Sequence, residues 1–183
     1  MRIIGGLQGG RKFYPPSGIP ARPTTELARE GLFNILSNQL DFKGMRTLDL
    51  FCGTGSISFE LASRGVSSLT LVDQDRATVR FIRETIDNLG FTGFSIFNAD
   101  VFRFIRQCTD QFDFIFAGPP YALENIDRIA DLIIGKKLLL PGGWFVLEHT
   151  KGYDFTGMPH FRMARHYGTT IFSIFILEPD TPS

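Results

Sequence analysis

Three acidic residues are the side chains in this chain best suited to hold a small polar ligand. Asp49, Asp73 and Asp100 each lie within or directly after a short apolar run typical of a buried strand. Carboxylates accept hydrogen bonds, so three of them at neighbouring strand ends suit a ligand with an amino group, a ribose diol and an adenine amine. Each acid taken alone could instead cap a helix or stabilise a turn.

A glycine turn follows the first of these acids. Gly53 and Gly55 come directly after the apolar run 48–51 and permit backbone conformations that other residues disfavour. Ser56 can cap the helix that follows, and Gly65 is suited to end it. Because ligands of open α/β sheets bind beyond the carboxyl ends of the strands, we expect the binding site at this turn.

The spacing of the glycines narrows the choice of nucleotide. The dinucleotide pattern requires a third glycine three residues after the second, and Ser58 occupies that position. The phosphate-binding pattern GxxxxGK[ST] is also missing from the sequence. Hydride transfer with NAD is therefore disfavoured.

Strands and helices alternate along the chain. Apolar runs predict strands at 48–51, 69–73, 94–97, 112–116, 144–147, 161–166 and 170–177, with helices at 26–36, 56–64, 79–89, 101–107 and 126–133. This order predicts an α/β Rossmann-like three-layer sandwich, whose mostly parallel sheet ends in a C-terminal antiparallel hairpin. We expect a single domain over 1–183, with an N-terminal accessory segment at 1–40 and the core at 41–183.

The composition is that of an ordinary globular protein. The net charge is zero, hydrophobic residues make up 43% and charged residues 21%. The two cysteines offer no disulfide framework, and the three histidines lack metal-ligand spacing with them. The sequence contains neither a signal peptide nor an apolar run of membrane length. We therefore expect a cytoplasmic protein without a metal or a membrane partner.

The first thirty residues carry an excess of basic side chains. The acids in this stretch are Glu26 and Glu30, and the basic residues are Arg2, Arg11, Lys12, Arg22 and Arg29. A local excess of this kind attracts phosphates within about 8–10 Å at physiological salt. The alternative is a solvated N-terminus without a nucleic-acid partner.

Two groups of residues resemble known methyltransferases. The pattern Asp49-x-Phe51-x-Gly53-x-Gly55 resembles the first motif of the class I S-adenosylmethionine-dependent methyltransferases. The segments 1–6, 10–12 and 22–36 are similar, more specifically, to the RsmD-type small-subunit rRNA (guanine-N2)-methyltransferases. This second resemblance covers nearly the whole chain, through residues 167–170.

The resemblance implies a cofactor and a role for each matching residue. The residues that it assigns to S-adenosylmethionine are Asp49, Phe51, Gly53, Gly55, Asp73, Asp100 and Val101. In that assignment Asp49 and the turn backbone hold the methionine end, Asp73 the ribose hydroxyls and Asp100 the adenine amine. The five basic residues would grip RNA phosphates, which position a substrate without reading its sequence. The implied partner is small-subunit rRNA, free or in an assembling 30S subunit.

The family's fourth motif, Asp- or Asn-Pro-Pro-Tyr, is present with one change. The matching residues are Gly118, Pro119, Pro120 and Tyr121. In the family the first side chain and a proline carbonyl hold the guanine amine, and the tyrosine stacks on the flipped-out base. Gly118 cannot supply that acceptor side chain. Misplacing a reacting group by about 1 Å can cost roughly 10²-fold in rate.

Several explanations of Gly118 stay open from the sequence. One is an engineered or accidental substitution in an otherwise normal enzyme, and another is that Glu124 or Asn125 takes over as acceptor. Alternatively, the chain is an inactive RNA- or ribosome-binding homologue that retains the cofactor pocket. A DNA amino-methyltransferase shares the Pro-Pro-Tyr logic, but the chain leaves no room for a target-recognition domain. Glu148 and His149 follow the 144–147 strand at the ligand-binding edge, where they could line the site, but a solvated loop is the favoured expectation.

Overall fold

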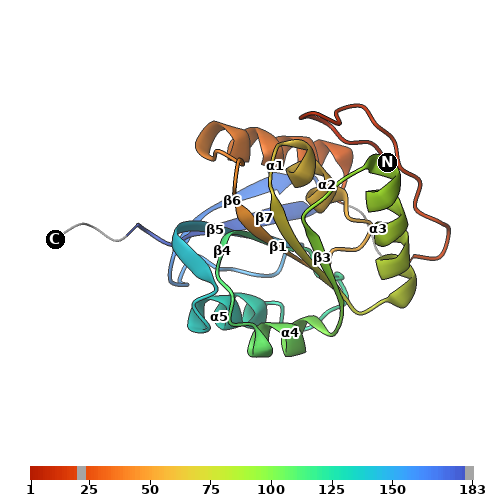
Figure 1. The fold of residues 1–183 in the computed structure, drawn as a ribbon. Coiled ribbons are helices and arrows are strands. Elements are labelled where there is room, and N and C mark those ends of the chain that lie inside the picture. The colour runs from red at the N-terminus through yellow and green to blue at the C-terminus, as the bar shows by residue number, and fades with distance from the viewer. Residues whose placement is uncertain (20–23, 180–183) are drawn as a thin grey trace.

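The structure, a computed structural model that describes residues 1–19 and 24–179, is built on one seven-stranded sheet (Figure 1). Its strands are β1 (Arg46–Leu50), β2 (Ser68–Asp73), β3 (Phe94–Asn98), β4 (Phe112–Ala117), β5 (Leu139–His149), β6 (Phe161–Tyr167) and β7 (Thr170–Ile176). Their order is β3-β2-β1-β4-β5-β7-β6. The pairs from β3 to β5 are parallel, and β7 is antiparallel to both of its neighbours. The predicted mostly parallel sheet with a C-terminal hairpin is confirmed.

Helices cover both faces of the sheet. Those in the described part of the chain are α1 (Glu26–Gln39), α2 (Ser56–Ser63), α3 (Arg76–Leu89), α4 (Val101–Gln107) and α5 (Asp127–Gly135). The helices α1, α2 and α3 pack on one face, and α4 and α5 pack on the other (Figure 1). The result is the three-layer sandwich that the alternating pattern predicts.

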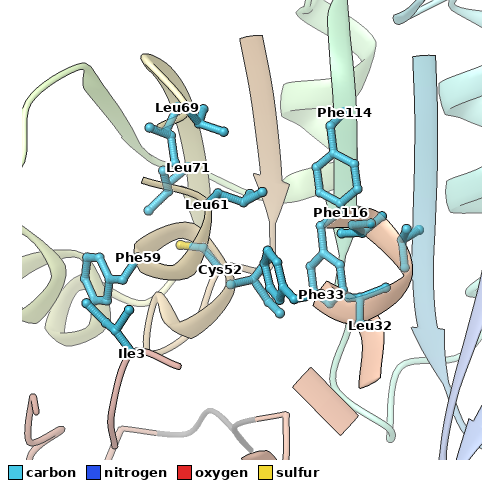
Figure 2. Close-up of a cluster of buried hydrophobic side chains, with 14 of the residues drawn as sticks. Ile3, Leu32, Phe33, Cys52, Phe59, Leu61, Leu69, Leu71, Phe114 and Phe116 are labelled. Atoms are coloured by element: carbon cyan, nitrogen blue, oxygen red, sulfur yellow. The ribbon is translucent and has the colours of Figure 1, made fainter. Parts of the chain in front are cut away.

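The central strands send alternate side chains into two separate cores. In β4, Phe114 and Phe116 face α1, where they lie near Leu32 and Phe33 (Figure 2). Ile115, between them in sequence, belongs to the core under α4 and α5. Because a parallel sheet is covered on both faces, its strands are apolar throughout and lack the polar alternation of a one-sided sheet.

The ends of two helices test the capping predictions. The Thr25 hydroxyl accepts the Ala28 N–H at 3.2 Å and so caps α1. The prediction that Ser56 caps α2 is wrong, because Gly55 holds the cap position in the left-handed conformation and Ser56 is already helical. Gly65, with φ of +102°, follows the end of α2 as expected.

Residues 1–13, here the N-terminal hairpin, fold back on themselves and dock on α2. The Ile3 N–H donates to the Arg11 carbonyl at 2.9 Å, and the Phe13 N–H donates to the Met1 carbonyl at 2.9 Å. Ile3 and Phe13 are buried, and the Phe13 ring meets the Phe59 ring edge-on with centroids 5.1 Å apart. The hairpin therefore belongs to the core on the α2 side of the sheet (Figure 2).

A buried carboxylate on α2 holds this hairpin. Glu60 is fully buried and accepts the N–H of Ile4 at 2.7 Å and of Gly5 at 2.9 Å. The same carboxylate pairs with the Arg64 guanidinium at 2.8 Å. Removing it would leave two backbone donors and one cation without their acceptor.

We expect Glu60→Ala to destabilise the fold by about 3 kcal/mol, because removing one member of a buried ion pair leaves the other charge without a partner. The measurement is urea unfolding, followed by circular dichroism. Glu30→Ala, an exposed carboxylate on α1, is the control and should lie within about 0.5 kcal/mol of the parent. A loss below about 1 kcal/mol for Glu60→Ala would show that the hairpin docks through its apolar contacts alone.

Candidate functional site

The carboxyl ends of β1 and β4 lie side by side at one edge of the sheet. Leu50, the last residue of β1, pairs with Ala117, the last residue of β4. The Gly118 N–H continues this ladder with a 3.1 Å bond to the Leu50 carbonyl. The chain leaves β1 towards β2 on one side, while β4 lies on the other side. This is a topological switch point, where ligands of α/β sheets bind.

The turn after β1 needs an unusual backbone. Phe51, Gly53 and Gly55 have φ values of +58°, +50° and +75°. A Cβ on Gly55 would lie 2.9 Å from the Phe59 ring, so both conformation and space require glycine there. The Gly53 N–H donates to Asp73 Oδ2 at 3.0 Å. The turn is thereby fastened to the end of β2.

Asp49 lies in β1 beneath the turn and is buried. Its Oδ2 accepts the Ser58 hydroxyl at 2.6 Å. Burial raises the pKa of Asp49 from 3.8 to about 7, although the Ser58 hydrogen bond opposes that shift. The role of Ser58 was missed in the sequence, where this residue stands out only because it replaces the third glycine of a dinucleotide site.

Asp73 is the second carboxylate at this edge. Burial raises its pKa, and the backbone N–H groups of Asp75 and Gly53 counteract the rise by bonding the ionised form. For both Asp49 and Asp73 the donors present offset only part of the effect of burial, so the protein stabilises their ionised forms incompletely. Such groups favour a ligand that brings a positive charge or hydrogen-bond donors.

The third acid, Asp100, caps α4 by accepting the Arg103 N–H at 2.8 Å. Its side chain is exposed at the same edge of the sheet. The preceding residue, Ala99, donates its N–H to the Asp73 carbonyl at 3.1 Å and so ties this segment to the end of β2. Val101 beside it is buried. Asp100 is thus a helix cap, and its predicted contact with adenine stays a prediction.

The Pro-Pro-Tyr turn leaves β4 on the other side of the switch point. The Tyr121 hydroxyl donates to Glu148 Oε1 at 3.2 Å and lies 3.3 Å from Thr170 Oγ1. A cavity of about 10 Å³, room for roughly one water, lies beside this turn. It is lined by Pro119, Pro120, Tyr121, Ile126, Glu148, His149, Thr150 and Tyr153.

The prediction that Glu148 and His149 lie in a solvated loop is wrong. They are the last residues of β5, which pairs with β7 as far as His149, and both are buried. Glu148 Oε2 accepts the Thr24 hydroxyl at 2.6 Å. The His149 ring nitrogens bond Ser173 Oγ and the Thr150 carbonyl, each at 2.8 Å, and burial lowers the pKa of His149.

Gly118 lies directly beside this buried carboxylate. A Cβ added to Gly118 would be 3.0 Å from a Phe116 ring carbon and 3.7 Å from Glu148 Oε2. Glu124 and Asn125, the acceptors nearest in sequence, line a separate, more open cavity of about 450 Å³. Glu148 is therefore next to position 118 in space, although Glu124 and Asn125 are much nearer to it in the sequence.

The five basic residues predicted to bind RNA differ in exposure. Arg2 pairs with Glu26 at 2.6 Å, Arg11 donates to carbonyls at the end of α3, and Lys12 is exposed. Arg29 contradicts the prediction: it is 1% exposed, and its guanidinium donates to the Arg2 carbonyl at 2.7 Å. The fifth residue, Arg22, lies outside the described residues.

Within residues 1–19 and 24–179, no helix is long and apolar enough to cross a membrane. The same residues contain no group of three or more histidine, cysteine, aspartate or glutamate side chains placed to hold a metal ion.

The sheet order, the switch-point turn and the C-terminal hairpin define the Rossmann-like fold of the class I methyltransferases. A 16S rRNA N2 G1207 methyltransferase of Thermus thermophilus, solved with AdoMet and guanosine, shares this fold. Its TM-score is 0.68 at 19% identity, over 87% of this chain and 45% of that one.

Sequence comparison identifies the family within that class. The chain belongs to the family described as conserved hypothetical protein 95, the RsmD-type methyltransferases, which it matches over residues 1–176. It is 30% identical to the Bacillus subtilis protein YlbH, provisionally named an rRNA methyltransferase, over 82% of this chain and 83% of that protein. It is also 30% identical to the ribosomal RNA small subunit methyltransferase D of Escherichia coli, over 73% of this chain and 66% of that protein.

The raised pKa of Asp49 predicts a pH-dependent effect of Asp49→Asn on stability. In the unfolded chain Asp49 loses its proton near pH 3.8, whereas in the fold it does so only near pH 7. Ionisation therefore destabilises the fold increasingly as pH rises between these values, and the penalty is complete above pH 7. Asparagine has no such penalty.

We expect Asp49→Asn to be roughly 4 kcal/mol more stable relative to the parent at pH 8 than at pH 4. Urea unfolding of the two proteins at each pH gives this difference, and other titrating groups cancel in the comparison. Asp87→Asn, an exposed carboxylate on α3, should show no such change. A constant difference between Asp49→Asn and the parent across this range would contradict the assigned pKa.

Proposed function

We propose that this protein is a cytoplasmic enzyme that transfers a methyl group from S-adenosylmethionine to the exocyclic N2 of a guanine in small-subunit rRNA. The observation that carries the proposal is the meeting of two turns at the switch point. The glycine turn leaves β1, the Pro-Pro-Tyr turn leaves β4, and the Gly118–Leu50 bond joins their starting points. A cofactor turn and a base-binding turn placed in this way bring two reactants together.

The residues of the glycine turn suit S-adenosylmethionine. The raised pKa values of Asp49 and Asp73 mark carboxylates short of positive charge and donors. The ammonium group and the ribose hydroxyls of this cofactor supply both. Asp49 would hold the methionine end, Asp73 the ribose and Asp100 the adenine amine, with Phe51 and Val101 packing beside them.

The chemistry asked of the protein is mainly placement. S-adenosylmethionine supplies a sulfonium methyl group that is already activated. The N2 amine of guanine is a weak nucleophile because its lone pair is delocalised into the ring. The protein must therefore hold the amine by its N–H groups and aim its lone pair at that methyl carbon. Tyr121 would stack on the base, while Arg2, Arg11 and Lys12 contact RNA phosphates.

The first test is a transfer assay with undermethylated small subunits and, separately, the naked small-subunit rRNA. Labelled S-adenosylmethionine should yield labelled N2-methylguanosine after digestion to nucleosides. Label in N6-methyladenosine would show that the methylated base is adenine, not guanine, and would still identify the protein as an RNA methyltransferase. The absence of any transfer, in both the parent and Gly118→Asp, would refute the proposed activity.

A second candidate function follows from Gly118 alone. Without an acceptor at this position, the chain would be an RNA- or ribosome-binding homologue that retains the cofactor pocket. Transfer by the unaltered protein at the rate of an active relative excludes this candidate. Rescue by Gly118→Asp would indicate an enzyme that lost activity through this one position.

Cofactor binding gives a prediction that does not depend on the methyl acceptor. Asp73→Asn keeps one acceptor oxygen for the Gly53 N–H but loses the oxygen that accepts the Asp75 N–H and the charge that would bind the ribose diol. We expect its Kd for S-adenosylmethionine to rise about tenfold or more, the loss of roughly one charge-assisted hydrogen bond. Isothermal titration calorimetry measures it, with Asp87→Asn as the matched control. An unchanged Kd would place the ribose elsewhere.

A further inference from the structure

We propose that Glu148 supplies the acceptor for the guanine N2 amine that the side chain at position 118 lacks. The inference rests on the proposed function and adds to it the residue that holds the base. Its first support is position. The added Cβ of Gly118 would be 3.7 Å from Glu148 Oε2, so this carboxylate lies where an aspartate or asparagine side chain at 118 would reach.

The sheet register explains why Gly118 and Glu148 are neighbours although they are thirty positions apart in the sequence. In the parallel pair of β4 and β5, Phe116 pairs with Val146 and Ala117 pairs with Leu147. Gly118 and Glu148 are the next residues along each strand. The adjacency is therefore fixed by the centre of the sheet and does not depend on a loop.

The Glu148 carboxylate is also held in one orientation. The Thr24 hydroxyl donates to Oε2 at 2.6 Å, and the Tyr121 hydroxyl donates to Oε1 at 3.2 Å. A carboxylate has about four lone-pair positions that can accept hydrogen bonds. The bonds from Thr24 and Tyr121 hold the carboxylate plane, and so fix the directions in which these lone pairs point. Because Tyr121 is the residue expected to stack on the base, the same ring would orient the base and the carboxylate.

With Glu148 in this role, methyl transfer needs no further acid, base or metal. The carboxylate accepts a hydrogen bond from an N–H of the guanine N2 amine. This bond orients the amine so that the nitrogen lone pair points towards the sulfonium methyl. The N2 lone pair forms the new N–C bond while the C–S bond breaks, and its electron pair leaves on sulfur. The extra N2 proton passes to Glu148 and then to water, which restores the carboxylate.

The other acceptors nearby fit this role less well. Glu124 and Asn125 line the separate cavity with Tyr153 and Phe155, away from Gly118. Glu124 is exposed, whereas Glu148 is 6% exposed in the small cavity beside Tyr121. A buried carboxylate interacts with a bound amine through less water and is therefore the stronger acceptor.

The test uses Glu148→Gln, which keeps the shape but loses the charge and one acceptor oxygen. We expect its single-turnover rate constant for transfer to fall about 10²-fold, with the Kd for S-adenosylmethionine within twofold of the parent. Glu124→Gln is the matched control and should keep the parent rate. Adding Gly118→Asp to Glu148→Gln should recover about tenfold, because an acceptor returns to the same place. A residue with a merely structural role gives no such rescue.

The outcomes separate this inference from the proposed function. A Glu148→Gln rate within threefold of an active parent overturns the inference alone. If Glu148→Gln fails to fold, Glu148→Asp decides in the same way, because a shorter carboxylate should slow transfer. If the parent is inactive and Gly118→Asp is active, the inference about Glu148 is overturned. The assignment of guanine methylation then still holds for the variant with an acceptor at position 118. Inactivity of both, with S-adenosylmethionine bound, overturns both.

Discussion

The pairing of β1 with β4 is the constraint on which the rest of the site depends. Their ladder runs to Leu50 and Ala117, and the Gly118 N–H adds one more bond to it. The two prolines that follow have no N–H to donate, so the ladder ends there and the chain must turn. A slip of one residue would reverse the faces of Phe114 and Phe116. Burial of these rings thus fixes where the two functional turns begin.

The site concentrates negative charge at one edge of a protein whose net charge is zero. Asp49 and Glu148 are buried there, and Asp73 is half-buried. Burial disfavours the ionised form of an acid and raises the pKa of Asp49 and of Asp73, so these two carboxylates weaken the fold unless donors compensate them. The donors present, such as Ser58 and the Gly53 N–H, compensate only in part. We expect a cationic ligand rich in donors to offset the remaining cost at Asp49 and Asp73.

The sequence pattern predicted the layers well because alternating strands and helices admit few arrangements. The buried face of α3, with Val79, Ile82 and Ile86, follows directly from the helical period. The errors concern contacts between segments that are distant in the chain. Arg29 resembles a phosphate ligand in sequence, but docking of the N-terminal hairpin buries it. Glu148 resembles a loop residue because its burial depends on the antiparallel partner β7, which lies 24 positions further on.

Gly118 illustrates the difference between a motif and a site. The chemistry needs an acceptor at a point in space, and two adjacent strand ends can each deliver one there. A Cβ at 118 would press on the Phe116 ring at 3.0 Å and would lie in ordinary contact with Glu148 Oε2, at 3.7 Å. An aspartate at 118 would instead place two carboxylates together, which raises the pKa of the pair. The same point in space can therefore be reached from either strand end, which is why the test compares single and double changes at positions 118 and 148.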